Sequence, residues 1–258
     1  MRFGRDWQEW RLWRGLEYVG GLSKLAKDTA RSMATQRWEG AQIVYQMDVL
    51  GVQSFSIVLI TATFMGMVLA IQTAYALDAF GAKLYVGEVV AISMTRELAP
   101  VIISLMVGGR VGAGITAEIG AMKVTEQIDA LRAMGANPVR KLVVPRLVAV
   151  LFFLPLLVLL ADALGILGGY IISTFELQIS GRFYFSHAFR MLKFTDVLSG
   201  LGKTVFFAFA ITLIGCYNGM TAGGGADGVG RATTFTVVLS SIVILISNFF
   251  LTKLFLAL

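Results

Sequence analysis

The sequence contains few charged residues, one cysteine and one histidine. Charged residues make up 15% of its 258 residues and hydrophobic residues 57%, and the mean hydropathy is +0.76. Soluble domains carry about 25% charged residues, so this composition excludes a soluble globular domain as well as disordered and collagen-like chains. The net charge of +6 comes from basic residues that lie largely at the ends of apolar segments, where they orient a membrane protein. We therefore expect a membrane protein that binds no nucleic acid.

The single cysteine and the single histidine limit the possible chemistry. Cys216 lies inside an apolar segment, so the chain has neither an internal disulfide framework nor a cysteine-based metal site. His187 is interpreted as a solvated loop residue, and one histidine supports neither a histidine metal cluster nor a Ser–His pair. Asp162 and Glu97 lack the glycine-flanked motif of membrane aspartyl proteases. We expect no catalytic residue and no metal site in this chain.

Residues 220–233 are rich in glycine and come closest to a nucleotide-binding motif. Residues 225–230 have the glycine spacing of a phosphate loop. However, Arg231 and Ala232 stand where lysine and serine or threonine are required, and a predicted membrane helix precedes them in place of a strand. We interpret this stretch as a tight turn whose glycines allow helices to approach closely. The chain is expected to bind no cofactor itself, with ATP and magnesium held by a partner.

Five apolar segments are long enough to cross a membrane, which takes about 20 residues in a helix. They are residues 49–77, 84–117, 147–175, 199–218 and 234–256. The predicted fold is an all-α polytopic membrane protein with a membrane domain over residues 49–258. No internal repeat is evident, so a transport path needs a second copy of the chain.

The N-terminal segment 1–48 is amphipathic. Aromatic residues and leucine recur at three- and four-residue spacing among arginines: Phe3, Trp7, Trp10, Trp13 and Leu16, with Arg2, Arg5, Arg11 and Arg14. This pattern predicts an interfacial helix in the headgroup plane, because amphipathic rings are enriched at membrane interfaces. The alternative is a soluble amphipathic helix that packs on a partner.

The distribution of lysine and arginine predicts the orientation of the spans. Residues 1–48 contain eight and the loop 118–146 contains five, whereas 78–83 contains one and the connector 176–198 contains three. Because basic loops stay in the cytoplasm, we place the N-terminus, 118–146 and 220–233 on that side. The C-terminus is then on the opposite side of the membrane.

The loop 118–146 contains a predicted helix. Apolar and charged residues recur with helical spacing: Ile128, Leu131, Met134 and Val139, with Glu126, Asp129 and Arg132. Gly135 and Pro138 end this helix. A short helix parallel to the membrane on the cytoplasmic face is suited to contact a soluble motor protein. A solvated loop helix without a partner is the alternative.

Ionisable residues inside membrane spans cost about 2.5–3.5 kcal/mol each on insertion scales, so they usually face a cavity or a partner. Arg96 and Glu97 are the main candidates, and adjacent helical residues point about 100° apart, so we expect them to have different partners. Lys203 either faces the same cavity or extends toward the membrane surface. Arg110 is interpreted as orienting the loop through backbone carbonyls or lipid phosphates.

Three separated motifs resemble those of the MlaE-type, MCE-associated permeases of ABC transporters. They are RELAPVIISLMVGGRVGAGITAEIG from residue 96, AEIGAMKVTEQIDALRAMGANPVRKLVVPR from residue 117 and GVGRATTFTVV from residue 228. The resemblance covers about residues 40–258. It implies a non-enzymatic bacterial inner-membrane subunit that moves phospholipids between that membrane and a periplasmic MCE protein, while a separate subunit hydrolyses ATP.

The resemblance also implies several partners. These are a second copy of the chain, an ABC ATPase (MlaF-like), a periplasmic ring of MCE-domain proteins (MlaD-like) and a small STAS-type subunit (MlaB-like). The ATPase would grip the loop 118–146, a coupling helix, through Glu126, Asp129, Arg132 and Gly135.

A lipid-binding cavity in the dimer is implied by the same resemblance. Arg96 and Glu97 of the RELAP motif, together with Lys203, match residues that line this cavity in the family. Asn248 stands where the family often has an acidic residue, so it offers hydrogen bonding in place of a salt bridge. Two alternatives are an ion-coupled transporter that uses Arg96, Glu97 and Asp162, and a membrane scaffold for an MCE ring.

Overall fold

The computed structural model describes residues 3–35 and 40–257, with the side chains of residues 13, 15–35 and 40–257. Every regular element within these ranges is helical, which confirms the all-α prediction. The helices are α1 (Phe3–Thr35), α2 (Gly40–Gln46), α3 (Phe55–Asp78), α4 (Val86–Ser93), α5 (Ala99–Val124), α6 (Gln127–Ala133), α7 (Val144–Phe175), α8 (Gly181–Met191), α9 (Phe194–Thr221) and α10 (Gly225–Ala257). Short helical turns join some of them: the 3₁₀ turns Val52–Ser54 and Lys83–Tyr85, and the π turns Met47–Gly51, Met94–Leu98 and Val139–Val143.

These elements combine into five segments that are long and apolar enough to cross a membrane. They are Gly40–Asp78, Lys83–Val124, Val139–Phe175, Phe194–Thr221 and Gly225–Ala257. The prediction of five spans is therefore confirmed. Each segment extends beyond the predicted apolar core, because polar residues at the ends continue the same helix.

Three predicted loops are largely helical. In 118–146, α5 continues to Val124 and helical structure resumes at Val139, and the connector 176–198 contains α8 and the start of α9. The predicted turn over 220–233 is wrong beyond residues 222–224, because α10 already begins at Gly225. Gly228 allows α10 to pack against the turn before it: a β-carbon there would overlap the carbonyl oxygen of Gly223.

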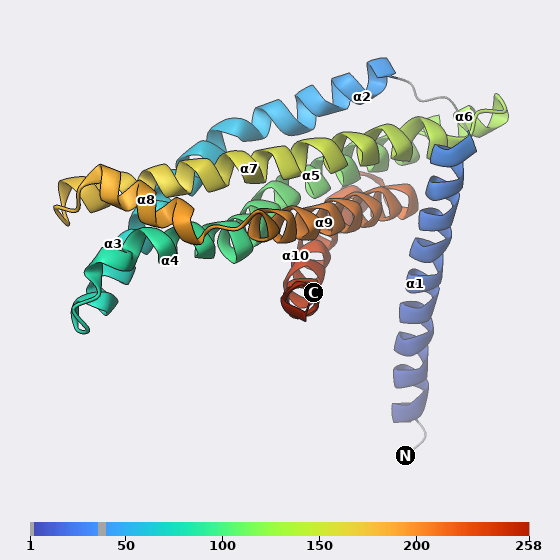
Figure 1. Ribbon diagram of the computed structural model, residues 1–258. Helices are drawn as coiled ribbons and strands as arrows, with labels where there is room; N and C mark the ends of the chain where they lie inside the picture. The colour runs from blue at the N-terminus through green and yellow to red at the C-terminus, as the bar shows by residue number, and fades with distance from the viewer. Residues whose placement is uncertain (1–2, 36–39, 258) are drawn as a thin grey trace.

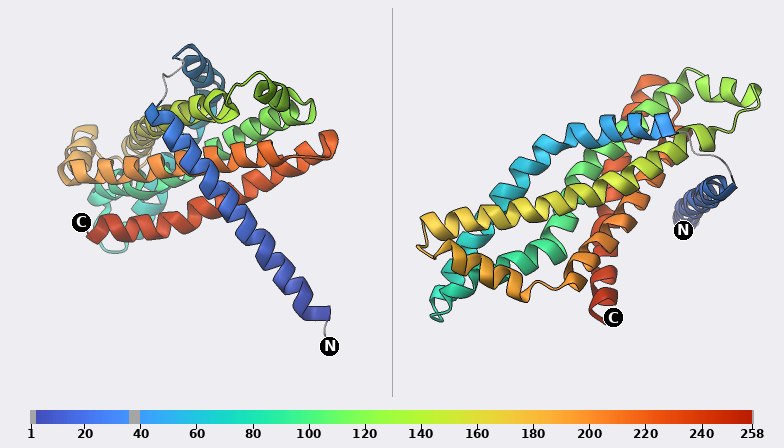
Figure 2. Two further views of the ribbon diagram at one scale, coloured as in Figure 1. Left: turned by 90° about the vertical axis from the view of Figure 1, so that its right-hand side faces the viewer. Right: turned by 45° about the horizontal axis from the view of Figure 1, so that its top comes forward.

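The long helices run side by side, and α1 crosses them. α3 packs along α7, and α5 packs along both α9 and α10 (Figure 1). α1 runs across this direction and meets one end of the bundle, where it contacts α9 and the turn Val139–Val143 (Figure 2). A helix in the membrane plane has such a direction relative to spans. The apolar and basic side chains of residues 2–12 and 14 lie outside the described ones, so the interfacial position of α1 stays a prediction.

The bundle has two distinct ends. α1, α6 and the turn between α9 and α10 lie at one end, here called the α6 end, whereas α8 and the turn between α3 and α4 lie at the other, the α8 end (Figure 1). This grouping of loops is the one that the distribution of lysine and arginine predicts. The assignment of the α6 end to the cytoplasm stays a prediction.

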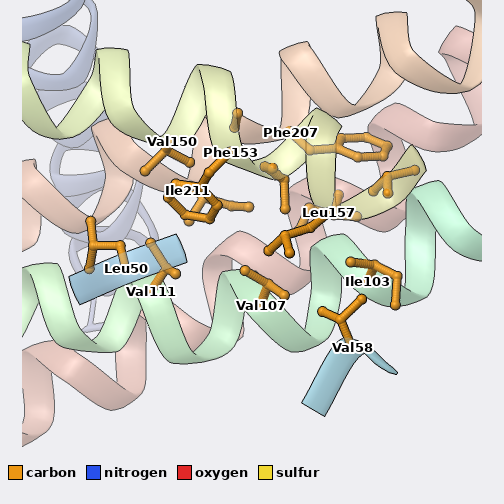
Figure 3. Packing of buried hydrophobic residues seen from close by; sticks show 14 of the residues in the cluster. Leu50, Val58, Ile103, Val107, Val111, Val150, Phe153, Leu157, Phe207 and Ile211 are labelled. Carbon is orange, nitrogen blue, oxygen red and sulfur yellow. The ribbon is translucent and has the colours of Figure 1, made fainter. Parts of the chain in front are cut away.

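Aliphatic and aromatic side chains fill the space between α5, α7 and α9. Those that point toward one another in Figure 3 include Val107, Val111, Phe153, Leu157, Phe207 and Ile211. Lipid tails are as apolar as these side chains, so close packing rather than the hydrophobic effect favours association of the spans.

Glycines bring α3 and α7 into backbone contact. A β-carbon on Gly66 would overlap the carbonyl oxygen of Gly165, and one on Gly168 would overlap that of Thr63. Small residues at such crossings allow the close approach that stabilises membrane helices. The contact between α3 and α7 therefore depends on the absence of side chains at these positions.

Replacing Gly66 by alanine is expected to force α3 and α7 apart and to lower the free energy of unfolding by about 1–3 kcal/mol, the usual cost of overpacking. The matched control is Gly114→Ala on α5, where an added methyl group meets no atom within 4 Å. There alanine is expected to stabilise the helix by about 0.5–1 kcal/mol. Unfolding in detergent, followed by circular dichroism, measures both variants. Equal stability of the two variants would contradict backbone contact between α3 and α7.

Candidate functional site

Arg96 and Glu97 lie on the π turn Met94–Leu98, between α4 and α5. A π turn adds one residue to a helical turn and is frequent at functional sites. Pro100 has no amide hydrogen, so it cannot donate to the carbonyl four residues earlier, which is that of Arg96. The ammonium group of Lys203 on α9 donates to this carbonyl, with an N–O distance of 2.9 Å. The proline thus frees an acceptor that a residue from another span uses.

α9 approaches the π turn closely because Gly200 has no side chain. A β-carbon on Gly200 would overlap the carbonyl oxygen of Thr95 and would lie 3.2 Å from Cγ of Pro100. Lys203 follows Gly200 by three residues and therefore lies near the same face of α9. This close approach brings the lysine within reach of the turn.

Lys203 is buried, with a side chain only 1% exposed, and its ammonium group has three acceptors. Besides the carbonyl of Arg96, these are Oε1 of Glu97 at 2.8 Å and Oγ1 of Thr252 on α10 at 2.7 Å. An ammonium group has three hydrogens, so these contacts occupy all of them. Lys203 therefore joins the π turn, α9 and α10 at one point.

Glu97 accepts hydrogen bonds from α10 as well. Oγ1 of Thr252 lies 3.0 Å from its Oε1, and Nδ2 of Asn248 donates to its Oε2 at 3.1 Å. Asn248 thus contributes hydrogen bonding, as its amide chemistry predicts. The structure brings three of the predicted site residues, Glu97, Lys203 and Asn248, into one cluster.

Arg96 points to a different partner. Its Nε lies 2.9 Å from Oδ1 of Asp196 at the start of α9, which confirms that Arg96 and Glu97 diverge. The side chain of Asp196 is buried, whereas that of Arg96 is 39% exposed. Among the described residues, the terminal guanidinium nitrogens of Arg96 have no hydrogen-bond partner. They are free donors beside a cluster whose other charges are paired.

Two adjoining pockets flank Glu97. The first, of about 190 Å³, is lined by Ile92, Ser93, Arg96, Glu97, Ser199, Thr252, Phe255 and Leu256. The second, of about 400 Å³, is lined by Glu97, Leu245, Asn248, Phe249, Thr252, Lys253 and Leu256. Larger hollows of about 550–860 Å³ lie at the α6 end, near Tyr18 and Phe235, but they contain none of the predicted lipid-site residues. We therefore place the site at the smaller pockets, where apolar walls meet exposed charges.

Sequence reasoning missed Asp196, Thr252 and Lys253. Asp196 accepts a hydrogen bond from the backbone amide of Lys193 at 2.9 Å and so caps α9. An acidic residue near the start of a helix is typical of such a cap, so the sequence did contain a signal for Asp196. Thr252 follows Asn248 by four residues, which places both on one helical face. The sequence does not distinguish Lys253 from a lysine that extends toward lipid headgroups.

α6, the predicted coupling helix, packs on the end of α5. Ile128 is fully buried there. Oδ2 of Asp129 lies 2.7 Å from Nζ of Lys123, and its Oδ1 lies 2.9 Å from Nη1 of Arg132. The hydrogen bond from Lys123, with the positive charges of both partners, holds the pKa of Asp129 below its usual range. Asp129 is therefore charged at neutral pH and holds α6 on α5.

The other predicted coupling residues surround α6. Glu126 and Gly135 flank the helix with left-handed backbone conformations, φ 60° and 76°, and both are exposed, as is Arg132. Gly135 ends the helix as expected, because glycine adopts this conformation without strain. Of the apolar residues at helical spacing, Met134 is exposed, whereas Ile128 is buried. Glu126, Arg132 and Gly135 form a free surface at this end.

An ion pair closes the base of the segment that carries α6. Nη2 of Arg146 on α7 lies 2.7 Å from Oε1 of Glu118 on α5, and its Nη1 donates to the carbonyl of Leu142 at 2.7 Å. The side chain of Arg146 is only 4% exposed. The Glu118–Arg146 pair thus joins α5 and α7 close to the points where the chain leaves for α6 and returns from it.

The interpretation of His187 as a solvated loop residue is wrong. Its Nδ1 lies 2.8 Å from Oε1 of Glu88 on α4, and its ring stacks on Phe183 at a centroid distance of 4.1 Å. The predicted loop is helical here, and α8 packs on α4, which half-buries the ring.

Two further ionisable residues lie apart from the cluster. Arg110 donates to Oγ of Ser54 and to Oε1 of Gln53, both at 2.9 Å, so its predicted contacts with backbone carbonyls are not formed. Asp162 is buried on α7, and its Oδ1 has no hydrogen-bond partner.

Within the described residues, no three His, Cys, Asp or Glu side chains are grouped so as to hold a metal ion.

Replacing Lys203 by methionine removes the ammonium group and keeps a similar side-chain length. Glu97 and the carbonyl of Arg96 then lose a shared donor, so the free energy of unfolding is expected to fall by about 1.5–3 kcal/mol, as for a hydrogen bond to a charged group. Adding Glu97→Gln is expected to cost less in this background than in the wild type, because the carboxylate has already lost its counter-ion. Unfolding of the wild type, both single variants and the double variant in detergent measures this coupling. Purely additive effects would rule out a direct pair.

Comparisons with known proteins place the chain in a family. A family model described as Permease MlaE matches residues 43–254. A probable ABC transporter permease protein of Rickettsia felis is 46% identical over 213 residues, 83% of this chain and 82% of that protein. The intermembrane phospholipid transport system permease protein MlaE of Haemophilus influenzae is 40% identical over 211 residues, 81% of each chain. The chloroplastic protein TRIGALACTOSYLDIACYLGLYCEROL 1 of Arabidopsis thaliana is 34% identical over 244 residues, 95% of this chain and 69% of that protein. This chain belongs to the MlaE permease family.

Proposed function

We propose that this chain is the permease subunit of an ABC transporter that moves phospholipids between the inner membrane and a periplasmic MCE-domain protein. The observation that carries the proposal is the Arg96 side chain, which lines a pocket with apolar walls and whose terminal guanidinium nitrogens have no partner among the described residues. A diacyl phospholipid needs cationic donors for its phosphate and apolar walls for its tails. The Haemophilus relative is named as a phospholipid transport permease, which supports the same substrate class.

In this proposal Arg96 binds the lipid phosphate and Lys203 maintains the shape of the site. A guanidinium group is planar and offers paired donors that match two phosphate oxygens. Lys203 is buried and its three hydrogens are already used, so phosphate binding there would require breaking contacts between spans. Glu97 and Asn248 belong to the wall of the site, and Lys253 lies at the edge of the second pocket.

α10 supplies the apolar wall for the lipid tails. Its exposed hydrophobic side chains are Phe235, Val238, Ile242, Leu245, Ile246, Phe249, Phe250, Leu254 and Leu256. In a homodimer, the α10 faces of two copies enclose the tails, and the pockets beside Glu97 open into the shared cavity. A second copy therefore completes the lipid path.

The α6 end receives the ATPase subunit in this proposal. The exposed residues Glu126, Arg132 and Gly135 contact the ATPase, while Asp129 holds α6 on α5. ATP and magnesium are bound by that partner, and this chain catalyses no reaction itself. The pair between Glu118 and the buried Arg146 transmits movement of α6 to α5 and α7, because it joins these helices at the base of the segment.

The remaining assignments follow the same orientation. The segment 1–48 lies in the headgroup plane on the cytoplasmic side, and the C-terminus is periplasmic. The MCE-domain ring binds above the α8 end, and a small STAS-type subunit accompanies the ATPase. These assignments rest on the resemblance and on the distribution of basic residues.

An ion-coupled mechanism has less support from the contacts. Arg96 pairs with Asp196, and Glu97 pairs with Lys203. Asp162 contacts neither pair, and its Oδ1 has no hydrogen-bond partner, so these groups form no continuous ionisable path among the described residues.

Replacing Arg96 by glutamine is expected to weaken phospholipid binding by roughly 10- to 150-fold, which corresponds to the loss of about 1.5–3 kcal/mol from a charge-assisted hydrogen bond. Native mass spectrometry of the purified protein measures the phospholipid that remains bound. The control is Arg231→Gln at the α6 end, which removes the same charge from an exposed site. Undiminished lipid in the Arg96 variant would overturn the assignment of the phosphate site.

Replacing Glu118 by glutamine keeps the shape of the side chain and removes the charge that pairs with Arg146. We expect the assembled transporter to retain ATPase activity while lipid transfer per ATP falls by roughly tenfold, because a lost pair of about 1–2 kcal/mol loosens the link from α6 to the spans. Glu118→Asp, which keeps the charge, is expected to restore part of the coupling. Parallel ATPase and lipid-transfer assays measure the ratio. An unchanged ratio would exclude a coupling role for this pair.

A further inference from the structure

We propose that the corner between α8 and α9 is a docking surface for phosphate-bearing lipid headgroups in the leaflet at the α8 end. From this surface, lipid moves sideways into the Arg96 pocket. The α8–α9 corner consists of Phe189, Arg190, Met191, Lys193 and Phe194, and all five are exposed. Docking rests on the contacts described below, whereas the sideways movement also rests on the proposed function.

The length of α9 places the corner at headgroup depth. α9 has 28 residues and is therefore about 42 Å long, at about 1.5 Å per residue. A bilayer is about 40–45 Å thick when its headgroup layers are included. When the last residue of α9 lies in one headgroup layer, its first residue, Phe194, lies in the other.

The chemistry of the corner suits that depth. The side chain of Phe194 is 76% exposed and that of Phe189 is 60% exposed, next to the cations Arg190 and Lys193. Residues 181–195 contain no acidic side chain. Aromatic rings are enriched at membrane interfaces, and basic side chains attract anionic headgroups. Both charge and apolar exposure thus fit a lipid surface.

The corner is held in place by the buried face of α8. Tyr184 is fully buried and its hydroxyl donates to the carbonyl of Ile166 at 3.1 Å, and Ala188 is buried one turn later. The ring of Phe189 stacks on that of Phe185, with centroids 5.9 Å apart. Figure 1 shows α8 beside α4 at the end of the bundle opposite α6. The exposed residues therefore belong to a packed helix end.

Asp196 connects the corner to the lipid site. Its Oδ2 accepts the backbone amide of Lys193, and its Oδ1 pairs with Nε of Arg96, both at 2.9 Å. Ser199, three residues further along α9, lines the Arg96 pocket. Arg96 thus lies close to the depth of the corner. A headgroup docked at the corner can reach it by lateral movement, without crossing the apolar part of the membrane.

A spin label measures the depth of the corner independently of transport. The native cysteine is buried, so Phe194→Cys in the full chain provides one reactive site for a nitroxide. In phosphatidylcholine vesicles that contain phosphatidylglycerol, accessibility to oxygen and to a water-soluble nickel complex is expected to place this label between two references. The deep reference is Phe152→Cys on the outer face of α7, and the aqueous reference is Asn137→Cys beside α6. A label as accessible to nickel as that at residue 137 would overturn docking. A label shielded from both reagents would also overturn it, because protein would then cover the corner.

The double variant Arg190→Gln, Lys193→Gln tests the role of the charges and keeps the backbone amide that Asp196 accepts. Each basic residue near an anionic surface raises the local lipid concentration by roughly fivefold. We therefore expect loading of fluorescent phosphatidylglycerol to slow by about tenfold or more at low salt, and the difference to shrink at high salt. The amount bound at saturation is expected to stay unchanged. The matched control, Arg182→Gln, lies on the same helix but away from the corner and is expected to load at the wild-type rate.

The outcomes separate docking from binding. A normal loading rate in the double variant would overturn the role of the two cations. Lower saturation at a normal rate would assign them to the binding site and overturn docking as well. If the wild type itself binds no phospholipid, the proposed function and the sideways movement both fail, while the depth of the label at residue 194 still decides whether the corner docks headgroups.

Discussion

The buried ammonium group of Lys203 is the contact on which the candidate lipid site depends. Inside a membrane bundle, the hydrogens of Lys203 must be met by protein acceptors, since no water replaces them. Pro100 frees the carbonyl of Arg96, the π turn presents Glu97, and α10 provides Thr252. Three spans are thereby fixed to one another by one group. Any movement of α10 relative to α9 must exchange these contacts rather than slide past them.

α5 connects the candidate lipid site to the segment that carries α6, the predicted coupling helix. The π turn leads directly into it, and Glu118 lies near its other end, paired with the buried Arg146 of α7. One helix therefore carries contacts of the lipid site at its start and the closure of the α6 segment near its end. In the proposed function, a displacement of α6 would reach Arg96 through this one helix, without a separate network between the two sites.

Features that depend on a local sequence pattern could be predicted, whereas contacts that form only when two spans approach each other could not. The length of the apolar segments was sufficient to predict the five spans. Helical periodicity was sufficient to predict α6 and the different directions of the Arg96 and Glu97 side chains. Glycine, by contrast, is found both in turns and at close contacts inside helices. The glycines of residues 220–233 predicted a turn, whereas Gly228 lies inside α10, which packs against the chain before it. The partner of His187 could not be predicted either, because Glu88 lies on α4 and contacts His187 only when α8 packs on α4.

The geometry of Arg96 suits the binding and release of an anion that the proposed function requires of this neutral cluster. The charges of Arg96, Glu97, Asp196 and Lys203 cancel, which keeps the cost of placing them in a bundle low. Asp196 uses only Nε of Arg96, so a phosphate can bind the terminal nitrogens without breaking an ion pair. In the proposed function such binding would be moderate, because Asp196 already offsets part of the positive charge that a phosphate would meet. This balance suits the proposed transfer of lipid to a partner, since an arginine without a counter-ion would hold the phosphate more strongly and release it more slowly.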